Sequence, residues 1–221
     1  VAPVGMFAWH ERDREDVLKA YFDVACDLAG LTHGHPTGML TAGVFAVLVL
    51  RLLDGSSMEL AVRDAQKTLE TQQSRFESSP GANETGLAVA QAVALAAESA
   101  GSSTEPGPQQ IAKLGEGWVA EEALAISIYC ALVAKDFEHG VTLAVNHSGD
   151  SDSTGAMTGN LLGAMLGIDA IPHRWTKTLE LKRVTESLAD DLYDYPSWSI
   201  GEYLLDDDNE NRLITKRYPG D

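Results

Sequence analysis

The sequence predicts an all-α fold, and three observations lead to this class. Apolar residues recur every three or four positions through most of the chain, which is the spacing of helices with one buried face. The strict alternation of apolar and polar residues that marks strands is scarce. Clusters of Gly, Pro, Ser and Asp separate the periodic stretches and supply stops and caps. We therefore expect one helical domain over residues 1–221.

Four helices are expected in the first half of the chain. The earliest follows the charged stretch His10–Asp16 and is stopped by Gly30, and Asp54 with Gly55 forms a later stop. The second helix is apolar almost all round, which predicts that it is buried. The expected helices span Arg14–Ala29, Thr37–Leu53, Ser57–Arg75 and Thr85–Ser99.

The second half of the chain opens with an expected linker, because the stretch Ala100–Gln110 is rich in Gly, Ser and Pro. The tail from Asp194 carries the acidic run Asp206–Asp208, which is expected to be a solvated loop. Between linker and tail, helices are expected at Val119–Lys135, at Phe137–Asn146, in the glycine-containing stretch that follows, and at Lys177–Tyr193.

Composition limits the possible functions. A hydrophobic content of 44% is ordinary for a globular protein, and a net charge of −17 argues against binding nucleic acid through its phosphates. The longest apolar run, Gly38–Leu53, is interrupted by Thr41 and Arg51, so no membrane span is expected. Cys26 and Cys130 lie in apolar helical patterns, which favours free, buried thiols in a reducing compartment. We expect a cytoplasmic protein that binds neither nucleic acid nor membrane.

The stretch Asn146–Gly167, NHSGDSDSTGAMTGNLLGAMLG, carries the strongest indication of a functional site. Asp150 and Asp152 lie one residue apart and are followed by the hydroxyls of Ser153 and Thr154. Hard cations prefer oxygen ligands of this kind, whereas a helix cap would need only one such residue. This turn is therefore a candidate metal site, with Thr154 a weaker candidate ligand than the other three residues.

Four glycines follow the acidic turn at a spacing of four residues. A glycine inside a helix costs roughly 1 kcal/mol relative to alanine, so a row of them needs a structural reason. At this spacing they lie on one face of the helix, where another backbone could approach closely. The four positions are Gly155, Gly159, Gly163 and Gly167.

Two other metal motifs share the letters of the acidic turn. An EF-hand loop that begins at Asp150 would need Glu at its twelfth position, where Leu161 stands, and is excluded. A phosphatase-type nucleophile motif would sit at the tip of an apolar strand, but Asn146–Gly149 separates the acids from the apolar run Val141–Val145. The phosphatase interpretation stays a minor alternative.

Histidines form a second group of candidates. His33 and His35 precede Pro36, where they could be metal ligands or could hydrogen-bond the turn. A magnesium site would prefer oxygen ligands to either imidazole. His147, next to the acidic turn, is a weak candidate for a general base.

A Gly-x-Gly-aromatic loop, Gly115–Trp118, precedes an expected helix. Its glycines let a ligand approach the backbone, and Trp118 offers a flat face to a base, although a buried, purely packing tryptophan is equally compatible with the pattern. Glu121 and Glu122 open the following helix, where acids suit the helix dipole, and we interpret them as structural.

Three blocks of the sequence resemble the ADP-ribosylglycohydrolase family, in particular its dinitrogenase-reductase-activating branch. They follow the family's order and are spread over most of the chain. They are VAPVGMF at 1–7 with LTHGHP at 31–36, LGEGWVAEEALAISIYC at 114–130, and NHSGDSDSTGAMTGNLLGAMLG at 146–167. The resemblance implies an orthogonal multi-helix domain of the family's type.

The resemblance also implies roles for individual residues. Asp150, Asp152 and Ser153 would be ligands of one or both ions of a two-magnesium site, which could also accept Mn²⁺, and the two acids would act in catalysis. His33 would contact bound ADP-ribose. The residues expected along the ADP-ribose cleft are Gly115, Glu116, Gly117 and Trp118.

The function implied is magnesium-dependent hydrolysis of the glycosidic bond of a mono-ADP-ribosylated protein, which releases ADP-ribose, with arginine as the favoured acceptor. The alternative is a catalytically inactive relative that binds ADP-ribose or, like crystallin-type members, acts structurally. Proteins of the family are longer at the N-terminus, where they carry a Thr-Asp-Asp metal cluster and a functional Glu. We therefore expect this chain to be the C-terminal part of such a hydrolase, with the N-terminal part as a possible partner.

Overall fold

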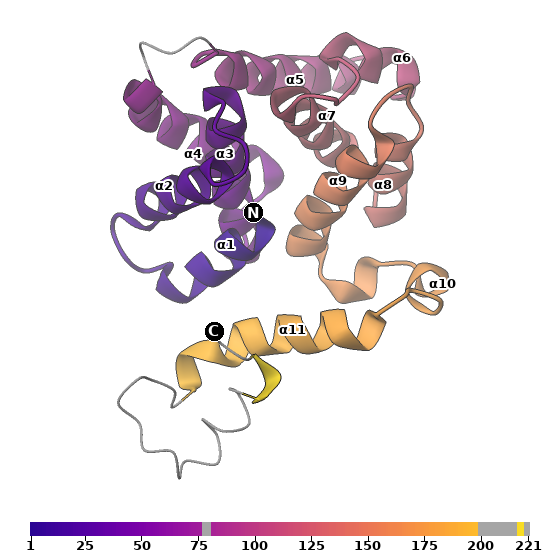
Figure 1. Ribbon diagram of the computed structural model, residues 1–221. Helices are drawn as coiled ribbons and strands as arrows, with labels where there is room; N and C mark the ends of the chain where they lie inside the picture. Colours follow the sequence, from indigo (N-terminus) through magenta and orange to yellow (C-terminus); the bar gives the residue numbers. More distant parts are fainter. Residues whose placement is uncertain (77–80, 199–215, 219–221) are drawn as a thin grey trace. The chain divides into compact units, whose positions relative to one another are not determined.

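Helices make up the regular structure of the computed structural model, which describes residues 1–76, 81–198 and 216–218 and contains no strand among them. The predicted all-α class is therefore confirmed. The chain divides into two compact units, Val1–Leu179 and Glu180–Asp221, which are described one at a time (Figure 1). The expectation of one domain over residues 1–221 stays a prediction.

The first unit contains the helices that carry the predicted functional residues (Figure 1). Short 3-10 segments follow several of them. In chain order the helices are α1 Ala2–Ala8, α2 Val17–Gly30, α3 Pro36–Leu53, α4 Met58–Gln72, α5 Glu84–Ala100, α6 Pro108–Ile111, α7 Ala120–Val133, α8 Phe137–Val145, α9 Ser151–Leu166 and α10 His173–Thr176.

Helix α3 is the centre of this unit, since it packs against α1, α2, α4, α7 and α9. Its side chains from Leu40 to Leu50 are all buried, which confirms the expectation from its apolar sequence. By length and hydropathy alone this helix could cross a membrane, but a buried core helix passes the same test. The helices packed around it show that it is a core helix in this fold.

The sequence did not predict the short helices α1 and α6, because neither is long enough to show a helical period. Both have proline in the first turn, where its fixed φ suits a helix start. Helix α6 occupies the end of the expected linker. Helix α1 packs directly on α3 through Gly5, where a Cβ would lie 2.5 Å from the Ala46 carbonyl oxygen and 2.8 Å from the Cβ of Val49.

Two predicted helix starts were also wrong. Helix α2 begins at Val17 instead of Arg14, after a series of turns. In the second unit, α11 begins at Lys182 instead of Lys177 and runs to Asp194, followed by a 3-10 turn. Leu181 explains the later start, because its φ of 56° is a left-handed conformation that a helix interior does not contain. The acidic run Asp206–Asp208 lies outside the described residues.

Helices α8 and α9 form an antiparallel hairpin and lie side by side (Figure 1). The glycine face of α9 is turned toward α8, but side chains approach it, not a backbone, which corrects the prediction. Only the first glycine is in a tight place, and Gly167 lies past the helix end with φ 79°. A Cβ would lie 2.5 Å from Val145 at Gly155, 4.0 Å from Val141 at Gly159, and 4.0 Å from Phe137 at Gly163.

Both cysteines are free and buried, as predicted. Cys26 lies in α2 and Cys130 in α7. Burial raises the pKa of each thiol to about 12, so both stay protonated and unreactive at neutral pH.

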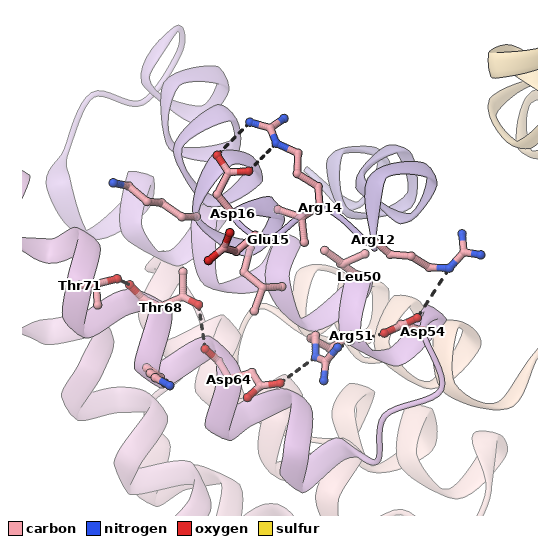
Figure 2. A pocket seen from close by; sticks show the side chains of 14 residues that line it. Arg12, Arg14, Glu15, Asp16, Leu50, Arg51, Asp54, Asp64, Thr68 and Thr71 are labelled. Atoms are coloured by element: carbon pink, nitrogen blue, oxygen red, sulfur yellow. Dashed lines mark hydrogen bonds and ion pairs between the residues drawn. The ribbon is translucent and has the colours of Figure 1, made fainter.

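A hollow of about 410 Å³ lies between the segment before α2, the end of α3 and α4, and Figure 2 shows the side chains that line it. Its side chains form an ion-pair network in which Arg51 binds Asp54 at 3.0 Å and Asp64 at 2.7 Å. Arg12 extends the network toward Asp54, at 3.9 Å. Because these cations already face carboxylates, we interpret the hollow as a structural link between α3 and α4.

Alanine substitutions on the glycine face of α9 should have opposite effects at its two ends. Alanine favours a helix interior by roughly 1 kcal/mol over glycine. Gly163→Ala, whose Cβ would only touch Phe137, should therefore raise the free energy of unfolding by up to about 1 kcal/mol. Gly155→Ala should lower it by about 1–2 kcal/mol, because Val145 must move. Urea unfolding measures both, and a stabilised Gly155→Ala protein would contradict the packing described.

Candidate functional site

Two loops that the sequence singled out meet in the structure. One is the turn between α8 and α9, and the other is the Gly115–Trp118 loop before α7. The backbone N–H of Asp150 donates a hydrogen bond to the Glu116 carbonyl at 2.8 Å. At Gly149 the two backbones are so close that any Cβ would clash with Glu116, so this position requires glycine. The predicted metal turn and the predicted cleft loop therefore form one site.

The Gly115–Trp118 loop adopts a conformation that only glycine accommodates easily. Gly115 has φ 107° and Gly117 has φ 81°, both in the left-handed region. A Cβ on Gly117 would also lie 3.0 Å from the Thr154 side chain. The Glu122 carboxylate accepts hydrogen bonds from the backbone N–H groups of this loop, so its structural interpretation is supported by direct contacts.

Trp118 presents an accessible face. Its side chain is 67% exposed, which decides against the buried, packing tryptophan that the sequence also allowed. The indole Nε1–H donates to the Glu116 carboxylate at 3.1 Å, which restricts how the ring can turn. An exposed and oriented aromatic ring is a suitable stacking surface for a base.

The paired carboxylates lie where α9 begins. Asp150 is the N-cap residue and is half-buried, but its side chain makes no capping hydrogen bond. Asp152 lies in the first turn and is exposed, and its carboxylate accepts from the Ser153 N–H at 3.0 Å. A hydrogen bond shared with the Asp150 carboxyl is the main cause that lowers the pKa of Asp152. The two carboxyl groups are therefore neighbours, as the sequence predicted.

This donor set is small for a metal site. Among the described residues, no group of three or more His, Cys, Asp and Glu side chains is placed to hold an ion. Asp150, Asp152 and Ser153 offer only oxygens, which suit a hard divalent cation, but such ions take about six ligands each. These residues therefore fit part of a magnesium or manganese site.

The Thr154 hydroxyl makes hydrogen bonds within the turn. Its buried hydroxyl lies 2.8 Å from the Ala144 carbonyl and 3.0 Å from the Asp150 carbonyl, both of which can accept its proton. The same oxygen lies 2.9 Å from His147 Nε2. Burial lowers the pKa of His147, which keeps the imidazole neutral at neutral pH. Thr154 and His147 thus fix the turn that holds the carboxylates.

The alternative metal motifs do not fit the backbone. Residues 141–145, which would form the strand of a phosphatase motif, belong to helix α8. Helix α9 starts at Ser151, so a twelve-residue EF-hand loop from Asp150 would be mostly helical. The phosphatase alternative is therefore wrong, and the exclusion of the EF-hand is confirmed.

A cavity of about 980 Å³ is lined in part by α9 and by the start of α7. Met157 and Asn160 line it, and Ser153 lies on the same face of the helix, because residues at this spacing share a face. The start of α7, directly after Trp118, lines the cavity with Val119 and Glu121. Its volume lies at the upper end of the usual range for small-molecule sites.

Both predicted histidines line this cavity. His35 caps α3, since its Nδ1 accepts from the Thr37 N–H at 3.3 Å, and His33 Nδ1 lies 2.9 Å from the Thr32 hydroxyl. Each therefore makes the turn hydrogen bond that the sequence allowed, while both remain exposed at the cavity. The contact of His33 with ADP-ribose stays a prediction.

Sequence reasoning missed other cavity residues. Thr37 donates to the Glu84 carboxylate at 2.9 Å, and both line the cavity, although they are far apart in the chain. No local motif marks such a pair. Asn160 could have been found, because it follows Ser153 and Met157 at helical spacing in the glycine helix.

Comparison with known proteins identifies the family of the chain. Residues 1–200 match the family described as ADP-ribosylglycohydrolase. The chain is 26% identical over 188 residues to the ADP-ribosylhydrolase ARH3 of Homo sapiens, which covers 75% of this chain and 50% of that protein. Over 50 residues it is 42% identical to the ADP-ribosyl-(dinitrogen reductase) glycohydrolase of Rhodospirillum rubrum, which covers 23% of this chain and 17% of that one.

A solved structure described as an ADP-ribosylglycohydrolase-related protein complex has a similar fold. It superposes with a TM-score of 0.52 at 26% sequence identity and covers 82% of this chain and 54% of that chain. This likeness confirms the orthogonal multi-helix fold type expected from the sequence. The chain spans about half the length of this structure and of the human relative.

The stability of the metal-free protein should depend on the protonation of His147. Its pKa in the folded state is lowered below its ordinary value of 6.5 by burial, so the unfolded chain takes up a proton first as the pH falls. The wild type should therefore lose stability as the pH falls from 7 to 5. Protonation of His147 in the unfolded chain should account for part of this loss. His147→Gln should be less stable at pH 7 but should lose less on acidification. Urea unfolding at several pH values measures this, and parallel pH curves for the two proteins would contradict it.

Proposed function

We propose a function for this chain from its family, since it belongs to the ADP-ribosylglycohydrolases. The proposed reaction is hydrolysis of the glycosidic bond between ADP-ribose and a side chain of a modified protein. Arginine is the acceptor that we propose, from the branch that the sequence resembles. The observation that carries the proposal is the 2.8 Å hydrogen bond between Asp150 and Glu116. It joins the carboxylate turn to the Trp118 loop, and the start of α7, which follows this loop, lines the cavity.

We further propose that Asp150, Asp152 and Ser153 hold magnesium, with manganese as a substitute. The all-oxygen donor set and the position of the half-buried Asp150 beside an exposed Asp152 support this assignment. Divalent cations bound in such a site orient the hydroxyls of a ligand and lower the pKa of a bound water. The remaining ligands would come from water, from substrate and from acids that lie outside these residues.

The chain's own side chains provide the electrostatics of the reaction. Cleavage at the anomeric carbon develops positive charge on the ribose ring. The negative charges of Asp150 and Asp152 would offset the charge of the bound cations, so that the ring is less strongly repelled. Trp118 supplies a flat apolar surface, and the Gly115–Trp118 loop leaves backbone accessible to a ligand. The cavity, with His33 at its edge, has the volume for a ligand of the size of ADP-ribose.

The partners and location that we propose follow from the same observations. The substrate is an ADP-ribosylated protein, since this is the kind of protein on which enzymes named as ADP-ribosylhydrolases act. The part of the longer relatives that this chain does not match could supply further metal ligands. The free, buried cysteines fit a reducing, cytoplasmic location.

One observation favours a second candidate function. Among the described residues, no third His, Cys, Asp or Glu side chain is placed to hold an ion together with the two carboxylates. A site of this kind could bind ADP-ribose without turning over a substrate, and a structural, crystallin-like role would need neither binding nor turnover.

The test is release of ADP-ribose from an arginine-ADP-ribosylated protein, with and without Mg²⁺. We expect Mg²⁺-dependent release by the wild type, a loss of at least about 100-fold in Asp150→Asn, and an unchanged helical circular dichroism spectrum. Asp169→Asn, an exposed acid just beyond α9, is the matched control and should keep full activity.

Calorimetric titration with ADP-ribose separates the alternatives. Binding without release would replace hydrolysis by the binding function. Neither binding nor release, or full activity in Asp150→Asn, would overturn the proposed site.

A further inference from the structure

The Glu122 carboxylate holds the Gly115–Trp118 loop through hydrogen bonds to its backbone. One of its oxygens, Oε2, accepts the backbone N–H of Glu116 at 3.0 Å and that of Gly117 at 3.0 Å. Such charge-assisted bonds are roughly twice as strong as those between neutral groups. A Cβ on Gly115 would clash with this carboxylate, so the glycine makes room for it. The loop backbone is thus built around this one side chain.

The position of Glu122 in α7 suits this role. It is the third residue of the helix, in the first turn, where the helix dipole favours a negative charge. The N-cap residue, Val119, has no side chain that could cap the helix. A glutamate at this position usually reaches back to the N-cap N–H, but Glu122 reaches beyond it, to two residues of the preceding loop.

One peptide group connects Glu122 to the carboxylate turn. The peptide between Glu116 and Gly117 donates its N–H to Glu122 and, through its carbonyl, accepts the N–H of Asp150 at 2.8 Å. Hydrogen bonds at the two ends of one peptide polarise each other and strengthen together. Because Gly149 packs directly on the same peptide, a shift of the loop would also displace the start of α9.

We infer that Glu122 is a positioning residue that acts on Asp150 through the peptide between Glu116 and Gly117. It also sets the exposed face of Trp118, since Gly117 immediately precedes this residue and Glu116 binds its indole. A carboxylate pair and a stacking surface are therefore held by one half-buried side chain. The kinetic part of this inference rests on the proposed function, whereas its structural part does not.

The first test is amide hydrogen exchange of Asp150 by NMR, which needs no catalytic activity. We expect exchange at least about 10-fold faster in Glu122→Ala, because the acceptor peptide loses its anchor. Glu122→Gln keeps one oxygen that can accept both N–H groups and should restore most of the protection. Glu59→Gln, an exposed acid in the first turn of α4, is the control and should leave Asp150 unchanged. Unchanged exchange in Glu122→Ala, or equal loss in both Glu122 variants and the control, would overturn the inference.

The second test measures kcat, KM and Mn²⁺ affinity for the same variants. We expect Glu122→Ala to lower kcat at least about 10-fold and to weaken Mn²⁺ binding several-fold, with Glu122→Gln between it and the wild type. Lower thermal stability with unchanged kcat and Mn²⁺ affinity would show a merely structural role and overturn the inference. If Glu122→Ala does not fold, the comparison of Glu122→Gln with Glu59→Gln decides. An inactive wild type would refute the proposed function, while the exchange and Mn²⁺ results would still decide this inference.

Discussion

The peptide group between Glu116 and Gly117 is the point on which the candidate site depends. Its carbonyl binds the N–H of Asp150 at 2.8 Å, and its N–H binds the Glu122 carboxylate at 3.0 Å. Two segments that lie far apart in the sequence are held together by this group. Backbone contacts of this kind are rigid, because the peptide group is planar and rotation about its C–N bond is strongly hindered. The carboxylate pair is consequently placed by the backbone, and its side chains remain available to a ligand.

This constraint explains why the two loops are so rich in glycine. At Gly149 and Gly115 a side chain would occupy the space of the opposing backbone or carboxylate, and at Gly117 the backbone conformation itself excludes most residues. Gly155 has the same role in the α8–α9 hairpin, where the absence of a side chain leaves room for Val145. The glycines thus serve close packing around the site more than flexibility. A tight, preorganised turn is what an electrostatic site needs, because its charges should not rearrange during the reaction.

Much of the fold could be predicted from the sequence, because long helices bury continuous faces and so leave a period, as α3 does. The carboxylate turn could also be recognised, since Asp150 and Asp152 are close in the chain. The bond between Asp150 and Glu116 could not, because a backbone carbonyl has no residue signature. The hydrogen bond between Thr37 and Glu84, 47 residues away, likewise leaves no pattern in a single sequence. Long-range polar contacts depend on how helices pack, which periodicity alone does not specify.

Manganese titration of the ¹⁵N-labelled protein tests the central claim most directly, since the paramagnetic ion broadens the signals of nearby amides. If both loops surround one cation site, small amounts of Mn²⁺ should broaden the amides of Glu116, Gly117, Asp150 and Asp152 first and together. The exposed acids of α4 should be unaffected at the same concentration. Broadening that is strongest elsewhere, or spread evenly over the acidic surface, would contradict the account.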